Sequence, residues 1–408
     1  VGAHVSMAGG IESAIENAKS IGANGERVAI KLRPKMAWAS KPIPQANVDE
    51  FKRRVLAEGY TSKVMPHGCY LTNLGNPDED KRAKSMGAFI DDLERCALLG
   101  IDLFNFHPGS SVGNCTTEEA CGTIADCINQ AHKQVKGCPT ILLENMAGAG
   151  NIIGGRFSDL GLIIKLVKDK SKVGVCLDTC HAFAAGYDLR TEAAFEETMA
   201  EFEREIGFGY LKALGSHKDR HANIGLGELG LWPFFKVMND KRFSLMPIVL
   251  ETPGYWNREV PALYALQGRR NDPADWQETR RLVEEVRVLR EQAEKAREAE
   301  KQKAKAEKAE KGGKEKGKQA KGKGKVKKAE SDGDSGSDSS SSDDGEEYRV
   351  KTISKKAAAK QSAPAKKASA KKTPAKAAAK PAPKRKSTAA SGSSSKRKKR
   401  EPAHSDDD

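Results

Sequence analysis

A carboxylate and an imidazole three residues apart, Asp178 and His181, follow a short apolar run and form the first candidate site in the sequence. The run, residues 173–177, has the composition of a buried strand, so both side chains are expected where this strand ends and a helix begins. Carboxylate oxygen and imidazole nitrogen are ligands of zinc and similar divalent ions. In the alternative interpretation, Asp178 caps the helix and His181 packs within it. The pair alone does not decide between these two interpretations.

Similar polar residues recur where other predicted strands end: His4, His67, His107, Glu144 and Glu251. A single residue of this kind does not identify a metal site, because a buried histidine is often satisfied by ordinary hydrogen bonds. A set of them at equivalent places in successive units is a stronger signal, since burying several carboxylates together is unfavourable unless a cation neutralises them. These ligands outnumber those of one tetrahedral ion, so we predict a multinuclear metal site. Closely spaced metals suit in-line displacement at a phosphodiester.

A second cluster lies in the segment SHKDRHANIGLGELG, residues 216–230, which contains Asp219 and His221. Asp-x-His could supply two ligands for a further ion, although a solvated charged loop would have the same composition. Cys176 and Cys180 precede His181 and could suggest half of a zinc finger. Cys176 alternates into the predicted strand and no second cysteine pair follows, so we interpret both cysteines as packing residues.

The elements that must position these residues alternate between strand and helix about eight times over the first 255 residues. Helices are predicted at residues 11–21, 45–59, 78–99, 116–135, 160–167, 192–206 and 231–238, and the intervening apolar segments, including 101–106, 140–143, 208–214 and 247–250, are predicted strands. This alternation favours an α/β fold of the (β/α)8 barrel type over a doubly wound sheet. No glycine-rich phosphate fingerprint follows the first strand, which argues against a dinucleotide-binding fold. In a barrel the carboxyl ends of the strands converge on one face, where active sites form.

The composition separates two unlike parts of a chain of 408 residues with net charge +14 and 38% hydrophobic residues. Residues up to about 251 have globular composition, whereas those after about 290 are mainly Lys, Ala, Glu, Ser and Gly. No apolar run reaches the length of a membrane span, so none is expected. The eight cysteines are scattered and no secretory signal opens the chain, which predicts reduced cysteines and an intracellular protein.

Several motifs, taken in order and spacing, resemble the endonuclease IV family of abasic-site DNA endonucleases. They are PHGCYLTNLG, NFHPGS, LLEN, GVCLDTCHAFAAGYDLRT, DRH and VLET, and GAHVSMAGG resembles the opening strand of that family. The resemblance runs from Gly2 to about Glu251. It implies a TIM barrel that binds three zinc ions and acts as a monomer in base excision repair. Its substrate would be double-stranded DNA with an abasic site, cleaved on the 5′ side to leave a 3′-hydroxyl.

The resemblance also assigns roles to individual residues. His67 and His107 would hold one zinc, and Glu144 would bridge it to a second and serve as the catalytic carboxylate. Asp178 and Glu251 would hold the second zinc. The third zinc would be held by His181, Asp219 and His221. Tyr70 and Leu71 resemble the loop residues that enter the DNA at the lesion, and Trp38 resembles a tryptophan that contacts DNA.

Two segments depart from the family pattern. The family's seventh strand ends in His followed by Leu-Asn-Asp, but YLKALGSHKDRH passes directly into the Asp-x-His loop, so one ligand of the second zinc is missing. Residues 25–37 keep the following Trp38 but not the sequence before it. A catalytically impaired DNA- or chromatin-binding relative is therefore an alternative. A sugar isomerase of the same barrel type is another, which the third zinc loop and the basic tail disfavour.

We therefore divide the chain into a TIM-barrel domain (1–255), a weakly matched segment with a charged helix (256–311) and a disordered Lys/Ala/Ser-rich tail (312–408). The basic stretches suit nonspecific DNA affinity through counterion release. The clusters at residues 384–386 and 396–400 resemble a bipartite nuclear import signal, which implies import receptors as partners and a nuclear location, with the mitochondrion left open. The acidic serine block, residues 331–347, is a candidate for phosphorylation.

Overall fold

The computed structural model of the protein describes residues 1–23, 28–30, 32, 38, 41–60, 64–215, 221–244 and 246–319. Asp219, the acidic serine block and both basic clusters lie outside these residues, so what we expect of them stays a prediction. Within the described part of the chain, no helix is both long enough and apolar enough to cross a lipid bilayer.

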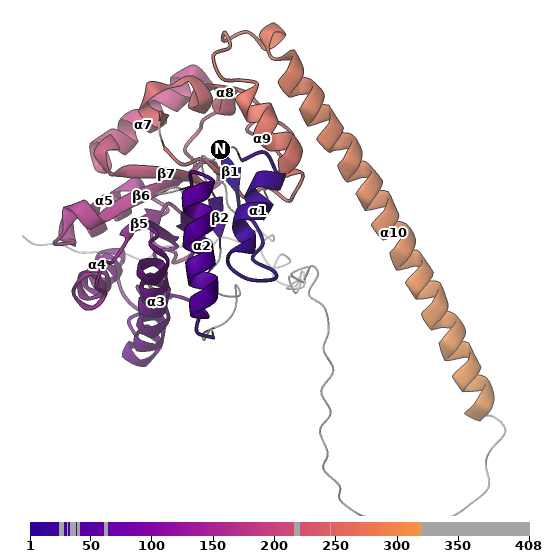
Figure 1. The fold of residues 1–408 in the computed structure, drawn as a ribbon, viewed down its shortest axis with the longest axis horizontal. Coiled ribbons are helices and arrows are strands. Elements are labelled where there is room, and N and C mark those ends of the chain that lie inside the picture. The colour runs from indigo at the N-terminus through magenta and orange to yellow at the C-terminus, as the bar shows by residue number, and fades with distance from the viewer. Residues whose placement is uncertain are drawn as a thin grey trace, which may run out of the picture. The chain divides into compact units, whose positions relative to one another are not determined.

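Eight short strands form the centre of the described structure (Figure 1). They are β1 (Gly2–Ala3), β2 (Val28–Ile30), β3 (Val64–Pro66), β4 (Leu103–Phe106), β5 (Thr140–Glu144), β6 (Val173–Asp178), β7 (Leu211–Gly215) and β8 (Val249–Leu250). All ladders are parallel: β1 pairs with β8, β2 with β3, and β4 to β7 form one continuous sheet. Single bridges, His4–Ala29 and His67–Asn105, join the sheets, and β7 lies beside β8. The strands therefore close on themselves, which confirms the predicted (β/α)8 barrel.

The structure describes ten α-helices, and most of those before α10 lie around the outside of the strands (Figure 1). Their bounds are α1 (Ser13–Ser20), α2 (Gln45–Ala57), α3 (Glu79–Leu99), α4 (Thr117–Gln134), α5 (Phe157–Leu166), α6 (Thr179–Ala184), α7 (Glu192–Glu205), α8 (Trp232–Asn239), α9 (Trp256–Tyr264) and α10 (Gln277–Gln319). Local signals set some of the ends: Thr116 and Glu119 form a capping box at the start of α4. Gly100 ends α3 in the left-handed conformation (φ 71°).

The predicted boundaries needed three corrections. The strand expected at 208–214 begins at Leu211, because residues Phe208–Tyr210 form a 3₁₀ turn. Helix α5 begins at Phe157, three residues before the predicted start at 160, and the Asp159 carboxylate accepts the Arg156 backbone N–H at 3.4 Å at this end. Helix α9 follows Glu251 and was not predicted; Pro261 inside its nine residues argues against a helix there.

A layer of apolar side chains fills the barrel interior, separate from the larger core between strands and helices. Its buried members come one each from six strands: Ala29, Met65, Leu142, Cys176, Ala213 and Val249. Leu103 of β4 packs against this layer. Side chains two residues apart on a strand point to the same side. The residue two positions beyond each layer member therefore also faces the barrel axis, nearer the carboxyl end.

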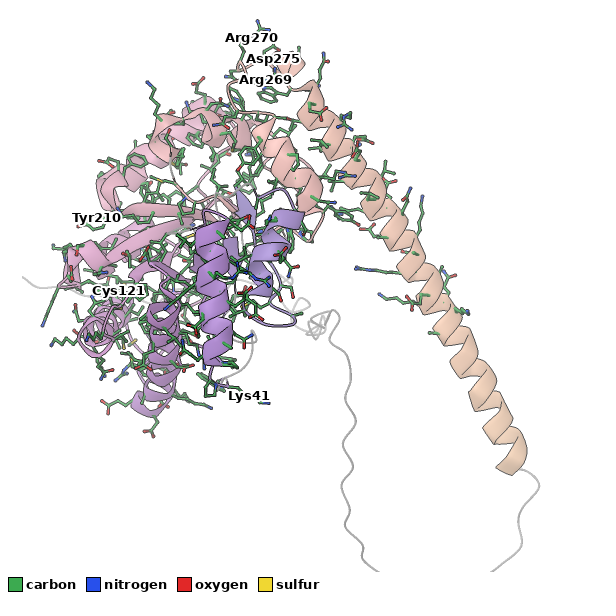
Figure 2. The ribbon with its side chains drawn as sticks, in the orientation of Figure 1. Lys41, Cys121, Tyr210, Arg269, Arg270 and Asp275 are labelled. Carbon is green, nitrogen blue, oxygen red and sulfur yellow. The ribbon has the colours of Figure 1, made fainter. Side chains whose placement is uncertain are left out.

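Residues after 255 share the barrel's core. A second cluster joins Val1 and Ala3 of the first strand segment to Val260 and Leu263 of α9 and to Trp276 before α10. Trp276 is 3% exposed, stacks on Phe235 with ring centroids 5.0 Å apart, and donates its indole N–H to the Arg270 carbonyl. Figure 2 shows Arg269, Arg270 and Asp275 at the turn that leads into α10.

Helix α10 is amphipathic only at its beginning. Leu282, Val283 and Val286 are buried and the Thr279 hydroxyl donates to the Ala262 carbonyl of α9, whereas Leu289 is 38% exposed. The apolar residues Leu282 and Val286 therefore belong to the part of α10 that packs on α9, but Leu289 lies outside that contact. The charged helix runs to Gln319, beyond the predicted end at residue 311.

Replacing Trp276 by alanine should destabilise the barrel itself. We expect Trp276→Ala to lower the free energy of unfolding by about 3–5 kcal/mol, the usual effect of emptying a buried aromatic site. Leu289→Ala, on the exposed side of the same helix, should stay within about 0.5 kcal/mol of the parent protein. Urea unfolding followed by far-UV circular dichroism measures both. Equal, small effects would show that the α9–α10 region does not share the barrel's stability.

Candidate metal centre

The strand-end residues singled out in the sequence gather at the carboxyl end of the barrel. His67 and Glu144 stand two residues beyond Met65 and Leu142 of the interior layer, and Asp178 stands two beyond Cys176. The strand register therefore turns these three side chains toward the barrel axis. His107 continues the same alternation along β4, four residues beyond Leu103.

The first group of metal-capable atoms belongs to His67, His107 and Glu144, whose ligand atoms lie within 4.8 Å of one another. Glu144 is fully buried, with Oε2 3.3 Å from His67 Nε2 and Oε1 3.6 Å from His107 Nε2. His67 Nδ1 donates to the Gly68 carbonyl (2.8 Å), which leaves Nε2 as the nitrogen with a lone pair facing Glu144. Asn105 Nδ2 donates to Glu144 Oε2 at 2.5 Å and holds this carboxylate in place.

The second group belongs to Asp178, His181 and His221, again within 4.8 Å of one another. Asp178 Oδ1 accepts the His181 backbone N–H at 2.7 Å, so Asp178 caps α6 as the structural interpretation expected. The same carboxylate also belongs to the metal-capable group, so the two interpretations are compatible. Glu144 Oε1 lies 3.3 Å from His181 Nδ1 and thereby links the two groups.

Asn145 holds the second group, and sequence reasoning missed it. Its side-chain amide pairs with both backbone groups of Asp178, accepting from the N–H at 2.5 Å and donating to the carbonyl at 3.0 Å. Its own carbonyl lies 2.9 Å from His181 Nδ1, which fixes the ring tautomer and directs Nε2 away from Asn145. The signal was available in LLEN, where a buried amide directly follows the strand-end glutamate.

Glu251 belongs to neither group, although its charge raises the pKa of Asp178. Its Oε1 is 2.7 Å from His4 Nε2, and both side chains are about nine-tenths buried, at 10% and 11% exposed. The β6–β7 register pairs Asp178 with Gly215, which has no side chain and therefore cannot supply a ligand beside Asp178. Among the described residues, Glu251 is not grouped with Asp178 and a third ligand as the resemblance implied.

The residues assigned to DNA contact have different surroundings. Tyr70 is half-buried and stacks on His107, with centroids 5.3 Å apart and an interplanar angle of 23°. Leu71 follows it and is also half-buried. Trp38 lies under the Lys84 ammonium, which is 4.4 Å from its ring centroid. Asp219 falls outside the described residues.

The electrostatics of the centre favour extra protons when no metal is bound. Burial, reinforced by repulsion from Glu144 and Glu251, raises the pKa of Asp178 to about 8 against the opposing effect of His181. Burial disfavours the charged imidazolium, but the carboxylates of Asp178 and Glu144 outweigh it and raise the pKa of His181. Burial and the same carboxylates also raise the pKa of Tyr70. Imidazole and carboxylate donors grouped in this way fit zinc, which would replace the protons as the neutralising charge.

Comparisons with known proteins agree with this geometry. A protein-family model described as a xylose isomerase-like TIM barrel matches residues 15–291. The chain is 46% identical over 279 residues to a protein named probable endonuclease 4 from Chlorobium phaeovibrioides, covering 65% of this chain and 99% of that protein. It is 44% identical over 277 residues to apurinic-apyrimidinic endonuclease 1 of Plasmodium berghei, covering 65% of this chain and 54% of that protein. The crystal structure of endonuclease IV from Thermus thermophilus matches with a TM-score of 0.57 and 29% identity, over 65% of this chain and 97% of that one.

The raised pKa values predict how stability responds to pH. The folded metal-free protein binds more protons than the unfolded chain, so its free energy of unfolding should fall as the pH rises from about 6.5 to about 9. Saturating zinc should remove or reverse this fall, because zinc binds the deprotonated ligands. Denaturant unfolding at both pH values, with chelator and with zinc, measures the effect. Stability that does not change with pH in chelator would contradict this account of the centre.

Proposed function

The chain belongs to the endonuclease IV family and is an apurinic/apyrimidinic (AP) endonuclease of DNA repair, and from this premise we propose how it acts. We propose that it uses bound zinc ions to hydrolyse the phosphodiester on the 5′ side of an abasic site, leaving a 3′-hydroxyl. The observation that carries this proposal is the fully buried Glu144, whose Oε2 lies 3.3 Å from His67 Nε2 and whose Oε1 lies 3.6 Å from His107 Nε2 and 3.3 Å from His181 Nδ1. A carboxylate in that position can connect two metal ions.

The metal ligands follow from the two groups. His67, His107 and Glu144 would hold one zinc, and Asp178, His181 and His221 would contribute to the others. Three ions, with Glu251 and Asp219 as further ligands, remain our proposal for the complete centre. Zinc supplies Lewis-acid stabilisation of the phosphate and lowers the pKa of a water molecule. In hydrolysis the water oxygen bonds to phosphorus as the bond to the 3′ oxygen breaks, and that oxygen takes up a proton.

The protein's own groups orient these reactants. Asn105 fixes one oxygen of Glu144 at 2.5 Å, so the carboxylate presents a defined face to the metals. Burial of His67 and Glu144 (3% and 0% exposed) keeps bulk water out, which strengthens each charge interaction there.

The DNA contacts follow from the same face of the barrel. We propose that Tyr70 and Leu71 enter the DNA where the base is missing, since a missing base lowers the cost of unstacking. Trp38 would contact the strand nearby. Attraction of the basic tail to phosphates would add affinity that falls as salt rises. The protein would act as a monomer.

A second candidate is a relative that binds abasic DNA but cuts it poorly. Gly215, beside Asp178 in the β6–β7 register, is the observation that favours it. With no ligand from β7, the ion nearest Asp178 would have fewer protein donors than the first. The identity of 43–46% to proteins named as endonucleases supports the AP endonuclease over a sugar isomerase.

We propose a nuclear location for the protein. The basic clusters at 384–386 and 396–400 would bind import receptors, and repair of nuclear DNA would follow from that location. A fusion of residues 376–408 to a fluorescent protein tests this proposal, with both clusters changed to alanine as the control.

Removing one charge at the centre should separate cutting from binding. We expect Glu144→Gln to incise a duplex with one synthetic abasic site at least about a thousand-fold more slowly, because several kcal/mol of transition-state stabilisation depend on the metals it holds. Its affinity for the same duplex should change little. Gel analysis of an end-labelled strand and fluorescence anisotropy measure the two quantities.

The matched control is Glu197→Gln, the same change at an exposed position of α7, which should cut at the parent rate. Chelator should abolish incision by the parent protein, zinc should restore it, and a polymerase should extend the product from its 3′ end. If the parent protein binds the abasic duplex but does not cut it with zinc present, the impaired relative is the correct assignment.

A further inference from the structure

A buried glutamate outside the metal groups, Glu259 of α9, joins two loops at the mouth of the barrel. The residue is only 2% exposed. Its Oε1 accepts the Ile224 backbone N–H at 2.8 Å and the Asn223 side-chain amide at 3.1 Å. Its Oε2 accepts a short hydrogen bond from the Thr252 hydroxyl. Three donors from two separate segments therefore meet on one carboxylate.

Each of these segments begins beside a candidate metal ligand. Asn223 is two residues after His221, and Thr252 directly follows Glu251. The Asn223 amide also donates to the Gly254 carbonyl at 3.0 Å, which ties the His221 loop to the Glu251 loop a second time. Movement of either loop would therefore have to break hydrogen bonds to the other or to Glu259.

The turn that places Glu259 is conformationally specialised. Gly254 (φ 97°) and Tyr255 (φ 65°) are consecutive residues in the left-handed region, which a tyrosine rarely occupies. The Trp256 indole donates back to the Thr252 carbonyl at 3.1 Å and closes this turn. Together these contacts start α9 in the direction that points Glu259 at both loops. A strained backbone retained in this way is typical of functional positions.

We propose that Glu259 is a positioning residue that sets His221 and Glu251 relative to each other for zinc binding. The inference rests on the proposed zinc-dependent function. The role requires a side chain that accepts hydrogen bonds, because the Ile224 N–H and the Asn223 amide can only donate. A glutamine could keep all three contacts, since the Thr252 hydroxyl can also accept, whereas a leucine of similar volume can accept none of them. Mutation of a residue that holds a metal ligand in place commonly lowers metal affinity or activity by about 10- to 100-fold.

The test compares zinc binding and catalysis in Glu259→Leu. Competition with a chromogenic zinc chelator should show at least one zinc bound about 10- to 100-fold more weakly than in the parent protein. On an abasic duplex, kcat should fall by a similar factor while KM changes less than about two-fold, and added zinc should restore much of kcat. Glu278→Leu makes the same change at an exposed position of α10 (52% exposed side chain) and should leave all three quantities unchanged.

Zinc affinity of Glu259→Leu within two-fold of the parent protein would overturn the inference, as would a loss of kcat that excess zinc does not restore. If thermal unfolding shows that this variant does not fold, Thr252→Val replaces it, because it removes one donor and keeps the shape. That variant should weaken zinc binding by a smaller factor, and unchanged binding would again overturn the inference. The zinc-competition measurement does not depend on DNA cleavage. If the parent protein does not cut DNA but the variant still binds zinc more weakly than the parent, only the proposed function is refuted.

Discussion

The structure depends on one electrostatic constraint: carboxylates that are buried together at the barrel mouth need positive charge nearby. Glu144 and Asp178 are both fully buried, and their mutual repulsion adds to the effect of burial on the pKa of Asp178. Isolated charges in such surroundings are strongly unfavourable. Protons and the His181 imidazolium meet part of this need in the metal-free protein, and divalent ions would meet it more completely. Bound cations would therefore stabilise the folded arrangement of these carboxylates.

The barrel satisfies this constraint through strand register. Apolar side chains such as Met65, Leu142 and Cys176 fill the interior, and the residue two positions after each of these three is a candidate ligand: His67, Glu144 and Asp178. A shift of one residue in any of these strands would replace the ligand by a side chain that faces the helices. Asn105 and Asn145 then restrict the ligands further, one through the Glu144 carboxylate and the other through the backbone of Asp178. Apolar packing fixes the height of each ligand, and amide hydrogen bonds fix its orientation.

The difference between local strand patterns and long-range hydrogen bonds explains which features could be predicted from the sequence. Strand–helix alternation and residues at strand ends are local patterns, so the barrel and the convergence of His67, His107, Glu144 and Asp178 could be inferred from it. Asn145 and Glu259 act on groups 33 to 36 residues away, often on backbone atoms, and no spacing rule identifies such partners. The contact of Glu251 with His4 depends on β8 lying beside β1, which becomes visible only when the barrel is closed. Helix α9 was missed because Pro261 in its interior argues against a helix.

The register argument also locates the weak point of the centre. Gly215 stands two residues beyond Ala213 of the interior layer, in the same position as Glu144 and Asp178 on their strands. This is the place from which the seventh strand would present a ligand, and a glycine has none to present. The segment after β7, which contains His221, and the segment after β8, which contains Glu251, would then have to hold any ion there without a ligand from β7 itself. Precise placement of those two loops therefore matters more in this chain than in a barrel with a complete set of strand-end ligands, and Glu259 is the buried group that connects them.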